Sequence, residues 1–251
     1  MIVAAHQPAY LPWLGYLHKV ARADLFVVMD DLQYEAQNFQ NRNRIKVNNG
    51  ALWLTVPLVR GSQHDRICDK QINNAGSAKE HWQRRTWMTL LTHYRRTPYF
   101  ALYADELESV YLRPWSRLVE LDLHVTQLML GWLGIARPIV LASSLDLSGE
   151  KTARILAMCK RVGARAYLSG AGGSTGYLDV PMLERAGIGV AWQRFTHPTY
   201  EQRYPQLGFI ARLSALDVLM NCGPAKSRAL LEEADGPRQL GAAPVLEGGV
   251  A

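Results

Sequence analysis

Apolar runs of strand length recur along the chain, separated by segments with the spacing of amphipathic helices. The runs that we predict as strands of one sheet lie at residues 2–5, 25–29, 139–142, 166–169 and 188–192. Strands that alternate with helices are typical of parallel sheets with right-handed crossovers. The pattern therefore predicts an α/β fold built on a Rossmann-like parallel sheet.

Between the second and third of these strands the pattern changes. Two β-rich runs, at residues 45–47 and 52–56, flank Asn48-Asn49-Gly50, and Asn-Gly in this setting indicates a hairpin. A further short strand is predicted near residues 67–72. Helical spacing then dominates, so we expect a helical insertion from about residue 77 to residue 135.

Local sequence patterns also predict where later helices begin and end and where the folded domain stops. The sequence Ser-Ala-Lys-Glu at residues 77–80 has the form of a capping box at the start of the insertion. A last helix is predicted to open at Ser214 and to end near Gly223-Pro224. From residue 236 the chain is rich in Gly, Ala and Pro, so we predict a disordered tail after one α/β domain over residues 1–235.

Composition narrows the class of protein. The 251 residues are 48% hydrophobic and 20% charged, as in ordinary soluble proteins. The three cysteines lie far apart without CxxC spacing, which argues against a disulfide framework or a structural zinc site. No signal peptide or membrane span is expected, so the predicted location is the cytoplasm. We expect no metal site, because His6, Asp30 and His197 lack a compact ligand spacing.

The formal net charge of +6 adds a hint about partners. It favours a small anionic substrate bearing a phosphate or carboxylate, a sugar nucleotide, or RNA. A solvated basic surface is the simpler alternative. A basic helix over residues 79–96 leaves tRNA as a minor possibility.

Polar residues follow directly after the first two predicted strands. His6 and Gln7 end the first strand, and Asp30 follows the second. Ligands of such sheets bind beyond the carboxyl ends of the strands. His6 can act as an acid or base near neutral pH, and Tyr10 and Trp13 can wall a pocket. In the alternative interpretation, His6 caps the strand and the aromatic residues belong to the core.

A group of hydrogen-bond donors lies after the second strand. Its members are Asn38, Asn41, Arg42, Asn43 and Lys46. Amides and a guanidinium suit the recognition of an anion or a sugar. A turn-rich loop whose asparagines bond to the backbone explains the same pattern equally well.

A glycine-rich loop follows the fourth predicted strand. Its backbone N–H groups can bind a phosphate or carboxylate, and its candidate residues are Ser169, Gly170, Gly172, Gly173 and Ser174. The loop lacks the Gly-Lys-Ser/Thr of a P-loop. His197 and Tyr200 follow the last strand, so we predict that they complete the same pocket.

Several of these motifs together resemble the WbqC-like family. The similar segments are HQPAYLPWLGY at residues 6–16, Asp30-Asp31, NRNRIK at 41–46, WLTVP at 53–57, YLSG at 167–170, YLD at 177–179, His197-Pro198, LSALD at 213–217 and NCG at 221–223. The resemblance implies a place in bacterial O-antigen, other surface-polysaccharide or natural-product clusters. It implies no particular reaction.

The opening strand is also similar to that of the HxGH nucleotidyltransferase-like (HUP) group, which includes pantothenate synthetase. That similarity implies ATP binding on a Rossmann-like sheet and the activation of carboxylates or phosphates. His6-Gln7-Pro8 departs from the motif, because it lacks the second His and the Gly.

From these features we expect a biosynthetic group-transfer enzyme. It would move an acyl or aminoacyl group to an amino-sugar or an amino-acid-derived acceptor. His6 would be the acid or base, Asp30 would position an amine or hydroxyl, and Arg42 and Lys46 would hold an anionic part. No cofactor is identified, although ATP or an activated acyl or aminoacyl donor fits. The alternatives are an ATP-dependent nucleotidyltransferase or ligase, and a non-catalytic scaffold protein.

Overall fold

The computed structural model describes residues 1–62, 64–75, 81–170, 172, 176 and 178–235. The expected tail from residue 236 and the capping-box segment at residues 77–80 therefore lie outside the described residues. The central sheet has five parallel strands, in the order β5-β2-β1-β6-β7. Their bounds are β1 Ile2–His6, β2 Leu25–Val28, β5 Ile139–Leu141, β6 Ala166–Ser169 and β7 Gly189–Trp192.

The strand order confirms the predicted α/β, Rossmann-like fold. Numbered by their entry into the sheet, the strands run 3-2-1-4-5, which is the arrangement of doubly wound dinucleotide-binding sheets. The chain leaves β1 toward one edge and later returns on the other side of β1 to form β6. The order thus reverses between β1 and β6, where the connections diverge and a crevice opens.

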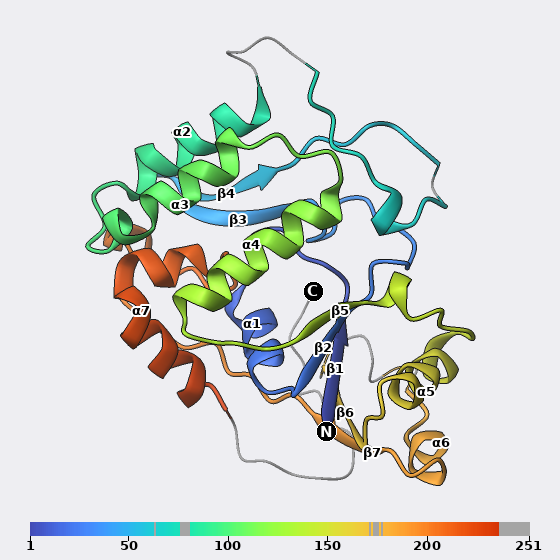
Figure 1. Cartoon of the computed structure of the whole chain (residues 1–251). Coiled ribbons are helices and arrows are strands. Elements are labelled where there is room, and N and C mark those ends of the chain that lie inside the picture. The colour runs from blue at the N-terminus through green and yellow to red at the C-terminus, as the bar shows by residue number, and fades with distance from the viewer. Residues whose placement is uncertain (63, 76–80, 171, 173–175, 177, 236–251) are drawn as a thin grey trace.

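The two faces of the sheet pack against different helices (Figure 1). Ala4 and Phe26 belong to a large core shared with α1 (Leu14–Ala21), α4 (Leu118–Trp132) and α7 (Leu216–Glu233). Val3 and Val27 point the other way and pack with α5 (Lys151–Arg161) and α6 (Val180–Arg185). Successive residues of each strand thus alternate between two apolar layers, so both faces are buried.

A second sheet and two further helices enlarge the first of these cores. The predicted hairpin forms an antiparallel pair, β3 (Arg42–Val47) and β4 (Gly50–Thr55). The helices α2 (Trp82–Tyr94) and α3 (Phe100–Leu112) precede α4, so helices fill most of the segment that we predicted as a helical insertion. Apolar residues of the hairpin and of these helices share one core.

Two sequence predictions need correction. The strand expected near residues 67–72 is a 3₁₀ helix over Ile67–Asp69, because the carboxyl end of β2 and the loop after it bind its first N–H groups. The helix predicted to end near Gly223-Pro224 is interrupted there as expected, but the sequence analysis missed the helical stretch that follows. Gly223 has a left-handed φ of 75°, and Pro224 then starts a second helical stretch that extends α7 to Glu233.

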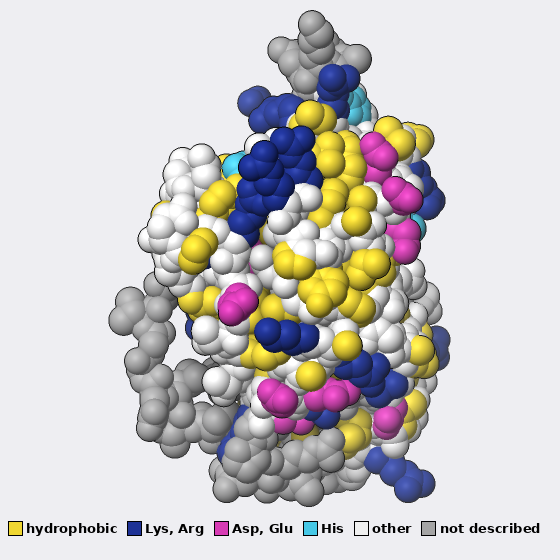
Figure 2. All heavy atoms as spheres, turned by 90° about the vertical axis from the view of Figure 1, so that its left-hand side faces the viewer, with side chains coloured by type: hydrophobic (Ala, Val, Ile, Leu, Met, Phe, Trp, Pro, Cys, Tyr) yellow, Lys and Arg dark blue, Asp and Glu magenta, His cyan; other side chains and the backbone are white. Residues whose placement is uncertain are grey.

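Some apolar side chains remain outside the core. Met88 on α2 and Leu102 and Leu112 on α3 are exposed. Figure 2 shows hydrophobic side chains gathering on the upper part of this side of the molecule, beside a group of Lys and Arg side chains. Within the described part of the chain, no helix is long and apolar enough to cross a membrane.

The kink in α7 gives a test of the packing. A Cβ at Gly223 would lie 2.6 Å from the ring of Tyr99, whereas one at Gly187 (φ 77°) would meet nothing within 4 Å. Gly187→Ala should cost about 1–2 kcal/mol of unfolding free energy through its left-handed φ alone. Gly223→Ala should cost about 1–3 kcal/mol more, because the added methyl overpacks. Denaturant unfolding measures both losses. In a Tyr99→Ala background, Gly223→Ala should cost less than it does in the native background, because the ring that the methyl overlaps is gone. An unchanged cost would contradict this account.

Candidate functional site

A cavity of about 690 Å³ opens at the carboxyl ends of β1 and β6, where the strand order reverses. Its walls come from the end of β1 and the turn after it, from α1, from residues 29–40, and from the starts of α5 and of the glycine-rich loop. Four cations line it, Lys19, Lys151, Arg154 and Arg212, and none of the described lining residues is acidic. The cavity is therefore suited to an anion.

His6 ends β1 on the wall of this cavity. Its side chain is accessible to solvent although protein surrounds it, as expected for a group that lines a concave site. Its Nδ1 lies 3.0 Å from the carbonyl oxygen of Gln7, which can only accept, so Nδ1 carries the proton and Nε2 keeps its lone pair. Burial, and then the charge of Lys19, lower the pKa of His6 to about 4. His6 is thus a neutral imidazole with a basic nitrogen.

Lys19 lies beneath both strand ends. Its side chain is 4% exposed, and its Nζ donates to the carbonyl oxygen of Ala5 at 2.8 Å. A Cβ at Gly170 would lie 3.7 Å from that Nζ, so the glycine leaves the ammonium close to the loop backbone. Burial lowers the pKa of Lys19 to about 8. Lys19 is therefore a cation at neutral pH that can lose its proton under mild conditions.

Lys19 was not among the site residues predicted from the sequence. The signal available in the sequence is the segment at residues 14–21, which is apolar apart from His18 and Lys19. A helix that is otherwise apolar on every side has no solvated face for a lysine. A lysine in such a helix, directly after the first strand, therefore predicts a buried cation near the end of that strand.

The remaining cations differ in how far they are neutralised. Arg154 forms an ion pair with Asp31 and also donates to the carbonyl oxygen of Leu147. Lys151 and Arg212 are exposed and take part in no ion pair among the described residues. Most of the free positive charge of the cavity therefore comes from Lys19, Lys151 and Arg212.

The cavity brings together part of the predicted site. His6, Gln7, Trp13, Asn38, Gly170 and Gly172 line it. The Gln7 side-chain oxygen accepts from Gln40, and Asn38 is held by Glu35. Gly173 and Ser174 lie outside the described residues. The first strand end and the glycine-rich loop thus meet at one site, as the sequence analysis expected of them.

Other predicted residues lie elsewhere and have structural partners. The carboxylate of Asp30 accepts from the backbone N–H and the hydroxyl of Ser143, and so caps the turn after β5. The hydroxyl of Tyr10 bonds that of Tyr111 in the core. Asn41 donates to the carbonyl oxygen of Val56. Ser169 is buried and does not line the cavity.

Lys46 and Tyr200 belong to one buried polar network behind the hairpin sheet. The Lys46 Nζ donates to the Gln202 side-chain oxygen at 3.2 Å and to the carbonyl oxygen of Gly208. Tyr200 donates to the carboxylate of Asp217 at 3.0 Å. These groups are satisfied by protein atoms, so they hold residues 200–208 against the core rather than lining the cavity.

Arg42, Asn43 and His197 complete this comparison. Arg42 lies over the ring of Trp53 on the hairpin sheet. Asn43 donates to the carbonyl oxygen of Leu11 at 2.7 Å, which fixes the turn before α1. The His197 Nδ1 lies 2.9 Å from the carbonyl oxygen of Pro198. None of the three lines the cavity.

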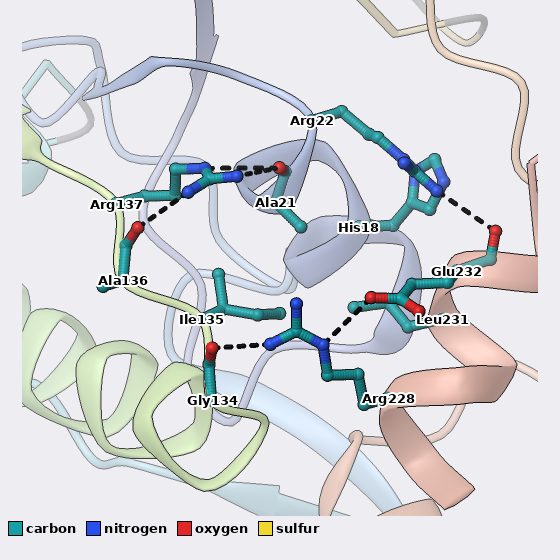
Figure 3. Close-up of a pocket in the computed structure, with 10 residues that line it drawn as sticks. All are labelled: His18, Ala21, Arg22, Gly134, Ile135, Ala136, Arg137, Arg228, Leu231 and Glu232. Atoms are coloured by element: carbon teal, nitrogen blue, oxygen red, sulfur yellow. Dashed lines mark hydrogen bonds and ion pairs between the residues drawn. The ribbon is translucent and has the colours of Figure 1, made fainter. Parts of the chain in front are cut away.

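A second, smaller pocket of about 130 Å³ also contains basic residues (Figure 3). Here the guanidinium groups bind carbonyl oxygens at or near helix ends: Arg137 binds Ala21, Arg228 binds Gly134, and Arg22 binds Glu232. Carbonyl groups at the end of a helix lack partners within the helix and attract cations. These arginines therefore cap α1, α4 and α7, which accounts for the pocket structurally.

Comparison with known proteins identifies the family. The sequence profile of the WbqC-like protein family matches residues 7–229. An uncharacterized protein of Mycobacterium tuberculosis, Rv1507c, is 34% identical over 225 residues, which cover 88% of this chain and 94% of that protein. The chain belongs to the WbqC-like protein family. No solved structure matches it.

Membership of the WbqC-like family gives no roles to individual residues, because the mycobacterial relative is uncharacterized. The chemistry must come from the site itself. Among the described residues, no group of three His, Cys, Asp or Glu side chains could hold a metal ion. The groups suited to proton transfer and to anion binding in the cavity are His6 and Lys19.

The buried state of Lys19 predicts a pH dependence of stability. Between about pH 8 and pH 10.5, the unfolded lysine binds a proton that the folded one does not, so stability rises with pH in this window. The full change is about 3 kcal/mol, since one pKa unit is about 1.4 kcal/mol. Lys19→Met should lack this rise. Urea unfolding of both proteins from pH 7 to pH 10.5 measures the difference, and parallel curves would mean that water solvates the ammonium.

Proposed function

We propose that this protein is a biosynthetic group-transfer enzyme that acts on a small anionic substrate in the cavity between β1 and β6. It moves an acyl or aminoacyl group to the amine of an amino-sugar or an amino-acid-derived acceptor. One observation carries the proposal: a neutral His6 with an unprotonated Nε2 and the Lys19 ammonium line one cavity, in which none of the described lining residues is acidic.

Acyl transfer uses these two groups in complementary ways. The acceptor amine attacks the acyl carbonyl, a C–N bond forms, and the C–O or C–S bond to the donor breaks. The attacking nitrogen loses a proton, which His6 accepts at Nε2 and passes to the leaving oxygen or sulfur. Lys19 is positioned to bind a carboxylate or phosphate of the substrate, or the oxyanion that develops during attack.

The low pKa of His6 fits this role. Its second cause is the positive charge of Lys19. An anion bound to Lys19 offsets that charge and raises the pKa of His6 toward neutrality. Substrate binding thereby makes the imidazole a better base at the moment when one is needed.

The size of the cavity and the family context agree with a small substrate. A volume of about 690 Å³ lies within the range of about 300–1,000 Å³ typical of small-molecule sites. The resemblance to proteins of surface-polysaccharide and natural-product clusters favours an amino-sugar or an amino-acid-derived acceptor. The three cysteines are free and buried, which favours a reducing cytoplasm.

A nucleotidyltransferase or ATP-dependent ligase is the second candidate. The 3-2-1-4-5 strand order and the aromatic residues Trp13, Tyr16 and Phe39 on the cavity wall suit a nucleotide. Against this, the glycine-rich loop contains no lysine for phosphates. Release of pyrophosphate from ATP in the presence of a carboxylate substrate separates the ligase from the transferase.

A ligand screen tests which half-reaction the cavity supports. We expect nucleotide sugars, amino acids, acyl-CoA or an aminoacylated RNA to raise the melting temperature of the protein, because a ligand that binds only the native state stabilises it. Thermal-shift measurements with each class, and with ATP, report this. A shift with ATP alone would favour the ligase, and a flat result with all of them would favour a scaffold protein.

Two substitutions distinguish a residue that binds the ligand, Lys19, from a residue that stabilises the fold, Asp30. Lys19→Met should weaken binding of the ligand found in the screen by at least tenfold, because loss of an ionic hydrogen bond costs about 1.5–3 kcal/mol. Asp30→Ala should leave that affinity within about threefold but lower the unfolding free energy by about 1–3 kcal/mol, since Ser143 loses its acceptor. Isothermal titration and denaturant unfolding of both variants check this. If Asp30→Ala weakened ligand binding and Lys19→Met did not, Asp30 rather than Lys19 would be the ligand-binding residue.

A further inference from the structure

The outer face of the hairpin sheet carries an aromatic and basic surface. We call it the hairpin face and define it as Phe39, Arg42, Arg44, Trp53 and Arg212. Arg44 lies directly opposite Trp53 in the strand register. The guanidinium carbons of Arg42 and Arg44 lie 4.3 Å and 5.6 Å from the centre of the Trp53 ring, and the Phe39 ring centre lies 5.7 Å from it.

The charge of the hairpin face is not neutralised by the protein. Within the described residues, no ion pair involves Arg42, Arg44 or Arg212. Arg42 donates to the carbonyl oxygen of Gln37, and Arg44 donates weakly to that of Arg212 at 3.5 Å. Among the described residues, these hydrogen bonds of Arg42 and Arg44 each use one terminal nitrogen of the guanidinium, and the Nε atoms are buried. These arginines retain donors for an outside anion.

The hairpin face is continuous with the cavity. Phe39 and Arg212 belong to both, because each lines the cavity and also borders the hairpin face. A cavity of about 690 Å³ has room for roughly one nucleotide or sugar unit. A longer ligand whose end lies in the cavity would therefore leave it over the hairpin face.

We propose that the hairpin face binds the single-stranded end of an RNA and directs its terminal nucleotide into the cavity. Proteins bind single strands by stacking bases on aromatic rings and arginine guanidinium planes, while basic side chains contact the phosphates. The hairpin face offers both kinds of contact within one surface. Trp53 is 39% exposed, and the guanidinium groups that cover it extend the stacking surface outward.

The inference deepens the proposed function and rests on it for the donor. The transferred group would be an aminoacyl group on the terminal ribose of the RNA. The ester bond to the ribose breaks, an amide bond forms on the acceptor amine, and His6 carries the proton from that amine to the ribose oxygen. The RNA leaves with a free hydroxyl, so atoms and charges balance without another reactant.

A polysaccharide is the competing occupant. Arginine stacked on tryptophan favours a nucleic acid, because planar bases stack on a guanidinium and phosphates recur at every residue. A neutral sugar chain would gain little from three uncompensated cations. The sequence analysis placed a possible RNA contact on the basic helix, but the exposed Arg84 and Arg85 of α2 do not line the cavity.

The experiment uses the full chain and a fluorescent RNA minihelix with a single-stranded 3′ end, without an attached amino acid. Fluorescence anisotropy at several salt concentrations gives the affinity and its salt slope. Trp53→Ala should weaken binding about tenfold or more. Arg44→Gln should weaken binding and reduce the salt slope by about 0.7–0.9. The charge-matched control is Arg84→Gln with Arg85→Gln, which should change affinity less than about threefold.

The outcomes separate this proposal from its rivals. Equal binding of a blunt minihelix without the single-stranded end, or normal affinity in both hairpin variants, would overturn it. Loss of binding only in the α2 variant would move the RNA site to that helix. Competition by oligogalacturonate but not by single-stranded RNA would assign the face to an acidic polysaccharide. Arg44→Gln leaves the buried side chains of the hairpin unchanged. It therefore tests RNA binding by the hairpin face even if Trp53→Ala unfolds the protein.

One more variant distinguishes failure of this proposal from failure of the proposed function. Lys19→Met removes the cation at the base of the cavity and leaves the hairpin face intact. It should weaken binding of the unacylated minihelix less than Trp53→Ala and Arg44→Gln do, because most of the contact lies outside the cavity. RNA binding that is lost in the hairpin variants and kept in Lys19→Met supports the surface, whatever reaction the cavity performs.

Discussion

The site depends on how a buried lysine ammonium is satisfied. Lys19 has three N–H donors, and the Ala5 carbonyl oxygen, at 2.8 Å, is its acceptor among the described residues. That bond ties α1 to the end of the strand at the centre of the sheet. Lys19 lines a cavity in which none of the described lining residues is acidic, so water or a bound anion must complete the hydrogen bonds of the ammonium. A protein that only needed a stable core would place an apolar residue here, so we interpret Lys19 as a binding group.

The same criterion separates ligand-binding residues from structural ones elsewhere. Asp30, Asn43 and Lys46 look alike in the sequence as polar residues near strand ends, yet protein atoms satisfy each of them. His6 and Lys19 differ, because both line the cavity, and among the described residues the protein partners are one carbonyl oxygen for the His6 Nδ1 and one for the Lys19 ammonium. Burial alone does not identify a site; burial beside a cavity, with partners missing on that side, does.

The parts that could be predicted from the sequence follow from local rules. Strands buried on both faces read as continuous apolar runs, so residues 2–5 and 25–29 were recognisable, and the ligand edge followed from parallel pairing. Residues 67–72 were misassigned, because neighbours distant in sequence decide whether a short apolar run pairs as a strand. Tyr10 and Asn41 were placed in the pocket, since a sequence does not show that Tyr111 and Val56 are their partners.

The charge state of the cavity connects binding with proton transfer. At neutral pH, His6 is neutral, and none of the described residues that line the cavity is acidic. Asp31 offsets Arg154. The remaining field comes from Lys19, Lys151 and Arg212 and favours an anion. A bound anion stabilises the protonated forms of both Lys19 and His6, so substrate and proton uptake reinforce each other. In the proposed reaction, a bound anion therefore raises the proton affinity of the His6 Nε2, the atom that must accept the proton of the attacking amine.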